Sequence, residues 1–240
     1  MALSDCPPAY GRRMHPILSG AYTRGRPSPS RGQRFQPEVY TAEEMNRILA
    51  NCGRGNAGAR NKAAFALMYR SGLRAMEVIG LELKDIDFEL GAVTVMHGKG
   101  NKRRLVPLDE HTAALIKLWL ARRAALGIAR RGPVFCTIEK GMRGRPVSYQ
   151  QLDASFKRAG ARAGIEKRLH LHGLRHSCAF DLRREGYDPL TICQVLGHSD
   201  LRVTQRYLNH IAPLDMIRAL SARAWPATDA ATLEHRAVAA

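Results

Sequence analysis

The sequence predicts an α+β fold that is mainly helical, with a small antiparallel sheet of about three strands. Apolar residues recur at three- and four-residue spacing over most of the chain beyond Thr41, as expected for amphipathic helices. The pattern changes in the first half of the chain to short extended runs at Phe88, Ala92–Met96 and Arg104–Pro107. Gly98 to Asn101 provide turn residues between the last two runs, which therefore form a predicted hairpin.

Three helices are expected before the sheet. Thr41 and Glu44 have the spacing of a capping box and open the first helix. The second is predicted over Ala59–Ser71, where Gly72 ends it, and a short third one runs from about Arg74 to Gly80.

The second half of the chain is predicted to be helical. After a long helix from Asp109 to about Leu126, Ser148 and Gln151 form a second capping-box pattern for a helix to about Ala163. The later helices are predicted from capping residues and apolar stripes. One begins at His172 and has Leu174, Cys178 and Leu182 on its buried face, and the next runs from Asp188–Pro189 to Leu196. Another is capped by Ser199 and carries Tyr207, and a last amphipathic segment covers Leu214–Leu220.

Composition divides the chain into three parts. Residues 1–38 are rich in Pro, Gly, Ser and Arg and are predicted to be a flexible basic arm. Residues 39–222 form the predicted globular domain, and residues 223–240 are an Ala-rich tail with weak structural signals.

The charge of the chain favours an anionic partner. Lys and Arg number 38 and Asp and Glu 21, which gives a net charge of +17. Nucleic acid is the first expectation and an anionic membrane surface the second. The longest uninterrupted apolar run, Ala63 to Tyr69, is too short to span a bilayer, and no signal peptide is visible. Five scattered cysteines without a C-x-x-C pair fit a reducing compartment. A soluble cytoplasmic protein is therefore expected.

Several polar residues have the chemistry needed to cut a phosphodiester without a metal. Such a reaction needs a nucleophile, cations on the non-bridging oxygens and an acid for the leaving oxygen. His172 and Arg175 are three residues apart on one predicted helix, so they share a face, and Arg74 opens another helix after a glycine. Tyr207 is a candidate nucleophile, because a phenolate oxygen can attack phosphorus and form a covalent intermediate.

Two further residues complete this candidate set. Lys99 lies at a glycine-flanked hairpin tip, from which its ammonium group can reach DNA and donate a proton. His198 follows a Leu-Gly turn nine residues before Tyr207, where it can bind the phosphate or assist deprotonation. Each of these residues taken alone has a plain structural explanation, as a solvated cation or a core aromatic residue. Only their joint occurrence favours catalysis.

The joint pattern resembles the catalytic signature of the tyrosine recombinases, the phage integrase family. The matching segments are Ser71-Gly-Leu-Arg74, His97-Gly-Lys-Gly-Asn-Lys-Arg-Arg-Leu-Val-Pro, His172-Gly-Leu-Arg175, Leu196-Gly-His198 and Tyr207, within a region from about Thr41 to Ala212. The resemblance implies that Arg74, Lys99, His172, Arg175, His198 and Tyr207 are catalytic, with Lys99 as general acid and Tyr207 as nucleophile. It implies that Glu77 supports Arg74.

The same resemblance implies a partner and a mode of action. Double-stranded DNA would be cleaved and rejoined through a 3′-phosphotyrosyl linkage, within a homotetramer that exchanges C-terminal helices and proceeds through a Holliday junction. No cofactor and no metal would be required. One departure is that family members usually carry a separate N-terminal helical domain that binds the other face of the DNA, whereas only about 40 residues precede the matching region here.

Two alternative functions follow from the same residues, and a metal site and a nucleotide-binding loop are disfavoured. A truncated integrase that binds DNA without cutting it is motivated by the missing domain. A type IB topoisomerase uses similar chemistry to relax DNA. His172 and His176 have a spacing that can bind zinc, but Gly173 stands where a metalloprotease would have its glutamate, so a metal site is disfavoured. Gly98-Lys99-Gly100 lacks the spacing of a nucleotide-binding P-loop.

Overall fold

The computed structural model describes residues 38–96 and 103–197, all within one compact unit of the chain, residues 37–240. It is mostly helical with one three-stranded antiparallel sheet, which confirms the predicted fold class. The helices are α1 (Ala42–Ala50), α2 (Asn56–Ser71), α3 (Ala75–Ile79), α4 (Glu110–Ala125), α5 (Tyr149–Arg162), α6 (Leu171–Arg184) and α7 (Pro189–Leu196), with a short 3₁₀ turn at Leu83–Asp85. None of these helices is long and apolar enough to cross a membrane.

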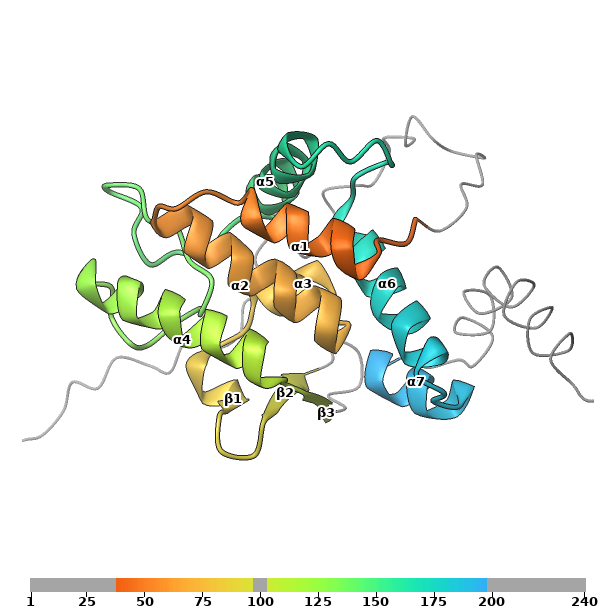
Figure 1. Ribbon diagram of the computed structural model, residues 1–240. Helices are drawn as coiled ribbons and strands as arrows, with labels where there is room; N and C mark the ends of the chain where they lie inside the picture. Colours follow the sequence, from red (N-terminus) through yellow and green to blue (C-terminus); the bar gives the residue numbers. More distant parts are fainter. Residues whose placement is uncertain (1–37, 97–102, 198–240) are drawn as a thin grey trace, which may run out of the picture. The chain divides into compact units, whose positions relative to one another are not determined.

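Helix α2 is the central element of this region. It packs against α4 and α6, while α1 packs against α5, as can be followed in Figure 1. Its sequence is rich in alanine, and 12 of its 16 residues are buried. One apolar core connects these helices with the inner face of the sheet, and it includes the edge-to-face contacts of Phe156 with Tyr40 and Phe65. Residues of α2 and Leu171 and Leu174 of the first turn of α6 share this core.

The capping signals in the sequence mark real helix ends. Thr41 and Glu44 form the predicted reciprocal capping box, and Ser148 and Gln151 form the second one. Asp188 caps α7, and Pro189 is its first residue as predicted. Each of these side chains satisfies backbone N–H groups that have no partner within the helix.

The predicted start of α2 is wrong, because the helix begins at Asn56 and not at Ala59. The helix has a glycine, Gly55, at its cap and no side-chain cap, so the sequence carries no start signal there. Gly58 lies in the first turn, where a Cβ would come within 2.2 Å of the Gly53 carbonyl oxygen. The close passage of the preceding loop therefore requires glycine at this position.

The sheet has the order β1–β2–β3, with β1 at Ile86–Asp87, β2 at Ala92–Met96 and β3 at Arg103–Pro107. Phe88 is expected in a strand but lies in the turn after β1. The reason is local: the Asp87 carboxylate accepts hydrogen bonds from the backbone N–H groups of Glu89 and Leu90 and closes a turn. In the hairpin, Val95 pairs with Arg104 and Val93 with Val106.

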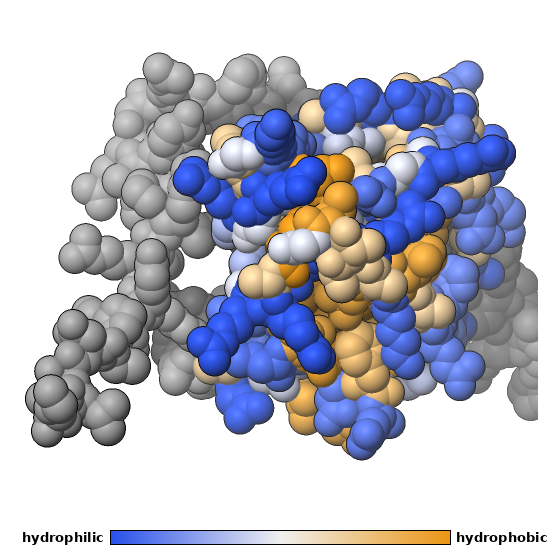
Figure 2. Space-filling view, turned by 90° about the vertical axis from the view of Figure 1, so that its left-hand side faces the viewer, coloured by the Kyte–Doolittle hydropathy of each residue, from blue (hydrophilic) through white to orange (hydrophobic). Residues whose placement is uncertain are grey.

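The outer surface includes apolar residues. On the face drawn in Figure 2, an apolar band runs between hydrophilic side chains. Over the described ranges the exposed large apolar side chains are Met76, Leu90, Leu105, Leu118, Met142, Tyr149, Tyr187 and Leu190. Exposed apolar residues are common on soluble domains, so this surface alone indicates no partner.

Candidate active site

Arg74 is held at the entrance to α3 by a carboxylate one turn further on. It occupies the cap position in an extended conformation, directly after the Gly72 turn that ends α2. Glu77 accepts a hydrogen bond from the Arg74 backbone N–H at 2.8 Å and another from its Nη1 at 3.0 Å. The contact between Glu77 and Arg74 is the one that the family resemblance implies. About two fifths of the Arg74 side chain (39%) stays exposed, so this cation can reach a phosphate.

A second arginine completes this ion-pair group. Arg104 of β3 donates two parallel hydrogen bonds to Glu77, from Nη1 to Oε1 at 2.9 Å and from Nη2 to Oε2 at 2.8 Å. Burial raises the pKa of Glu77, but the hydrogen bonds and charge of Arg104 and then of Arg74 outweigh it and lower that pKa to about 2. Glu77 is therefore a fixed anion at neutral pH, shared by two cations.

Arg175 lies deeper in the molecule. It is on the first turns of α6, and only 2% of its surface is exposed. Its Nη1 donates to the Gly72 carbonyl at 2.6 Å, and its Nη2 donates to the Leu196 carbonyl at 2.5 Å. The guanidinium thus joins the end of α2 to the end of α7, although the two carbonyls that it binds, those of Gly72 and Leu196, are 124 positions apart in the chain (196 − 72).

The C-terminus of α7 brings the arginines together. Arg104 Nε donates to the Val195 carbonyl at 3.1 Å, and Arg74 Nη2 donates to the Gly197 carbonyl at 3.3 Å. With the bond from Arg175 to Leu196, three successive carbonyls each accept a hydrogen bond from a different arginine. A helix C-terminus carries partial negative charge, which cations stabilise. Arg74 and Arg175, 101 positions apart in sequence (175 − 74), therefore meet at one turn.

His172 lies on the same side of α6 as Arg175, as their spacing predicts. More than a third of its surface is exposed. Even so, partial desolvation, followed by the charges of Arg175, His170 and Arg74, lowers its pKa from 6.5 to about 4. Its ring packs edge to face against the ring of His176, with 4.5 Å between the two ring centroids. A neutral imidazole at this position can donate or accept one hydrogen bond at a phosphate without adding charge.

The depressed pKa of His172 predicts a pH dependence of stability. In the unfolded chain the imidazole binds a proton near pH 6.5, whereas in the folded protein it does so only near pH 4. Because the unfolded state binds more protons between these values, the free energy of unfolding falls as the pH drops from 6.5 towards 4. We expect His172→Gln to weaken this dependence in urea unfolding at pH 7 and pH 5.

The matched control for this prediction is His111→Gln, at an exposed histidine of α4. It should leave the pH dependence as in the wild type. If His172→Gln and the wild type lose the same stability between the two pH values, burial and the neighbouring cations do not suppress protonation of His172.

Tyr40 positions the start of α6, a role for which the sequence carries no signal. Its backbone N–H donates to Ser177 Oγ at 2.7 Å, and its hydroxyl donates to the Arg168 carbonyl at 3.0 Å and accepts from the His170 N–H at 3.1 Å. The ring lies against Gly173, where a Cβ would come within 2.6 Å of it. The glycine between His172 and Arg175 is therefore required by this contact. His170 caps α6 by accepting from the Gly173 N–H.

Three of the six predicted catalytic residues, Lys99, His198 and Tyr207, lie outside the described residues, so their positions stay predictions. The same holds for the helix capped by Ser199 and the segment Leu214–Leu220. Within residues 38–96 and 103–197, no three His, Cys, Asp or Glu side chains are grouped so that they could hold a metal ion. His176 is 8% exposed and packs on His172.

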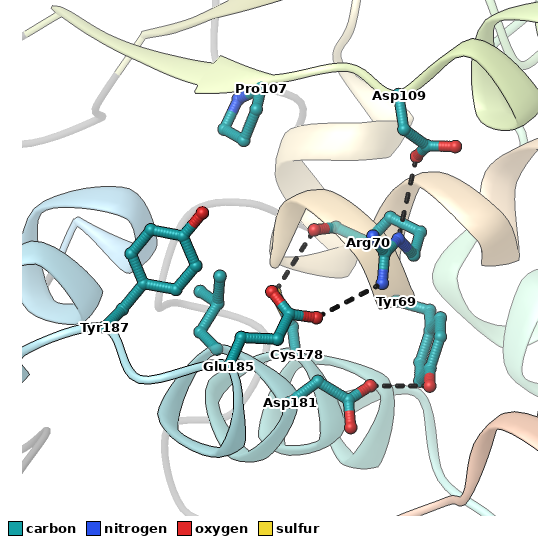
Figure 3. A pocket seen from close by; sticks show the side chains of 9 residues that line it. Tyr69, Arg70, Pro107, Asp109, Cys178, Asp181, Glu185 and Tyr187 are labelled. Carbon is teal, nitrogen blue, oxygen red and sulfur yellow. Dashed lines mark hydrogen bonds and ion pairs between the residues drawn. The ribbon is translucent and has the colours of Figure 1, made fainter.

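A separate pocket lies between α2, α6 and the start of α4 (Figure 3). Tyr69 donates to Asp181 at 2.6 Å, and Arg70 forms ion pairs with Asp109 and Glu185. Its volume of about 180 Å³ is below the range of about 300–1,000 Å³ of small-molecule sites. These contacts hold α2 against its neighbours, and Arg74, His172 and Arg175, the predicted catalytic residues within the described ranges, do not line the pocket.

Arg104 is the site residue that the sequence reasoning misses. The sequence motif contains Arg104 only as one residue of the predicted strand Arg104–Pro107. The sequence nevertheless carries a signal that could have identified its role. Strand residues alternate between faces, so Arg104 shares the face of Val106, which is buried. A charged residue at an inward-facing strand position needs a buried partner, and this requirement indicates an ion pair.

Comparisons with known proteins identify the family of the chain. The model of the phage integrase family matches residues 38–212. Tyrosine recombinase XerD of Bifidobacterium longum is 35% identical over 198 residues, which cover 78% of this chain and 62% of that protein. The chain thus spans about three fifths of the length of this relative.

Solved structures show the same fold. A crystal structure of the XerA recombinase matches with a TM-score of 0.68 at 23% identity, over 83% of this chain and 67% of that one. The XerH site-specific recombinase, bound to a palindromic difH substrate after cleavage, matches with a TM-score of 0.66 at 26% identity, over 78% of this chain and 54% of that one. The chain belongs to the phage integrase family, and its described residues have the fold of a tyrosine recombinase catalytic domain.

Proposed function

We propose that this protein is a site-specific recombinase or integrase that cleaves and rejoins double-stranded DNA through a 3′-phosphotyrosyl intermediate. The observation that carries the proposal is the meeting of Arg74 and Arg175 at the last turn of α7, with His172 close enough to both arginines for their charges to lower its pKa. The chain continues from this turn directly into His198 and, nine residues later, Tyr207. The segment that carries the proposed nucleophile therefore starts next to a cationic site that could bind phosphate.

Each residue has a role in the proposed step. The Tyr207 hydroxyl gives up its proton, for which His198 is an acceptor, and its oxygen attacks phosphorus and forms the 3′-phosphotyrosyl bond while the bond from phosphorus to the 5′ oxygen breaks. Arg74, Arg175, His172 and His198 stabilise the negative charge of the pentavalent phosphate, because positioned donors act most strongly where charge develops. Lys99 donates a proton to the leaving 5′ oxygen. The phosphotyrosine keeps the energy of the broken bond, so rejoining needs no cofactor.

The proposal includes the assembly and the substrate. Double-stranded DNA is the proposed partner. In support, XerH has been solved bound to its difH substrate, and the Tn1549 transposon integrase in complex with transposon right end DNA. The net charge of +17 supports such a partner. We expect a homotetramer on DNA with exchange of C-terminal helices, and action in the cytoplasm. The proposed catalytic domain spans residues 39–222, between a basic arm (1–38) and a C-terminal tail (223–240).

Covalent capture tests the proposed chemistry. The protein is incubated with fragmented host DNA that carries nicks, the mixture is denatured in SDS, and protein-linked DNA is isolated and sequenced. With the wild-type protein we expect adducts whose DNA shares a sequence motif. With Tyr207→Phe we expect no adducts, because the ring without its hydroxyl has no nucleophile.

The matched control is Tyr187→Phe, at an exposed tyrosine of the described region, which should form adducts as the wild type does. Absence of adducts in wild type and mutant, with DNA binding unchanged by Tyr207→Phe, would replace this proposal with a DNA-binding protein that does not cut. Relaxation of plasmids without recombinant products would instead favour topoisomerase activity.

A further inference from the structure

The end of α7 depends on side chains from other elements. The Gly197 N–H bonds to the carbonyls of Cys193 and Gln194, so the helix itself satisfies these two acceptors. The following carbonyls, of Val195, Leu196 and Gly197, accept from three arginines. Helix α7 has no basic residue of its own in its last turn. The charge that stabilises this helix end is therefore supplied from β3, α6 and the start of α3.

Arg104 differs from the other two arginines in what else it binds. Arg74 and Arg175 belong to the proposed phosphate site, whereas both Nη atoms of Arg104 bind the carboxylate of Glu77. Its Nε binds the Val195 carbonyl. One rigid, planar guanidinium thus sets the distance between the α3 carboxylate and the end of α7, because its donors have a fixed fork geometry.

Two features link the position of the Arg104 guanidinium to the proposed reaction. Glu77 binds both the backbone and the side chain of Arg74, so the orientation of Glu77 sets that of Arg74. Val195 lies three residues before His198 in the chain, so its position sets where the segment of His198 and Tyr207 starts. A displacement of about 1 Å in a catalytic group can slow a reaction on the order of a hundredfold.

We infer that Arg104 is a positioning residue, which couples Arg74 to the end of α7 and so aligns the phosphate site with the segment that carries the nucleophile. It acts through Glu77 and the Val195 carbonyl and does not itself contact the phosphate. The inference rests on the proposed function for its catalytic consequence. Its structural consequence, the ordering of the α7 end, can be measured without activity.

Hydrogen exchange of the α7 amides tests the structural consequence. We expect Arg104→Gln to speed exchange of the Gly197 N–H and its neighbours by about tenfold, since one hydrogen bond and one cation are lost from the helix end. Arg103→Gln is the matched control, because Arg103 is the adjacent, exposed arginine of the same strand and faces the other way. It should leave α7 exchange unchanged.

Cleavage kinetics test the catalytic consequence, on the DNA motif recovered by covalent capture. We expect Arg104→Gln to lower the rate of adduct formation by about tenfold to a hundredfold with unchanged DNA affinity. On a substrate with a neutral methylphosphonate at the cleaved position the defect should shrink, because Arg74 then has less charge to stabilise. A general loss of structure would slow both substrates equally. Arg104→Lys keeps the charge without the fork and should fall between glutamine and the wild type.

The outcomes separate the two proposals. If the wild type forms no adduct, the proposed function fails, and the exchange measurement alone decides whether Arg104 orders α7. If the wild type cleaves but Arg104→Gln matches Arg103→Gln in exchange or in rate, the inference is overturned while the proposed function stands. Equal defects on the charged and neutral substrates overturn it as well.

Discussion

Arg175→Lys is expected to slow DNA cleavage by on the order of a hundredfold to a thousandfold, the typical cost of one lost donor at a developing oxyanion. Lysine keeps the positive charge, but it lacks the planar guanidinium whose two Nη atoms donate to the Gly72 and Leu196 carbonyls. The free energy of unfolding should also fall, by about 1–3 kcal/mol for each buried carbonyl that loses its donor. Adduct formation and urea unfolding measure the two effects.

The control for this prediction is Arg123→Lys. Arg123 is a second buried arginine, 3% exposed, on α4, where it donates to the Arg131 carbonyl. We expect this substitution to lower stability while DNA cleavage by the remaining folded protein stays at the wild-type rate. If Arg175→Lys cleaves DNA at the wild-type rate, Arg175 does not belong to the proposed phosphate site.

Gly72→Ala is expected to cost more stability than the same substitution at any open turn. Gly72 ends α2 with φ of 65°, and a Cβ there would lie 2.6 Å from Leu196 Cδ2 and 3.2 Å from Cys178 Sγ. Leu196 is 1% exposed and is confined by the packing around it. The left-handed backbone costs roughly 1–2 kcal/mol for alanine, and the crowding adds about 1–3 kcal/mol.

Gly127→Ala separates these two costs. Gly127 has a similar φ of 70°, but a Cβ at this position would have no atom within 4 Å, so only the backbone cost applies. The difference in unfolding free energy between the two variants therefore measures the contact between Gly72 and Leu196. Because that contact lies beside the Arg175 bonds, we expect only Gly72→Ala to slow adduct formation. Equal losses of stability in both variants would contradict this account.

The local signals in the sequence are reliable where one side chain with a single strong preference decides the outcome. Thr41, Ser148 and Asp188 cap their helices as predicted, and Gly72 ends α2. The predictions fail where the signal is missing or where two local structures compete. Gly55 caps α2 without a hydrogen-bonding side chain, and the turn closed by the Asp87 carboxylate removes Phe88 from the strand.

The sequence by itself determined the mainly helical α+β fold, the family, and the proposal that Arg74, His172 and Arg175 act together, because motif spacing and helix periodicity are local properties. Only the tertiary structure decided how these residues meet. Arg104 joins Glu77, and three arginines share the end of α7, through contacts between segments far apart in the chain. Such contacts depend on how helices and strands pack around one core, and no local pattern encodes that packing.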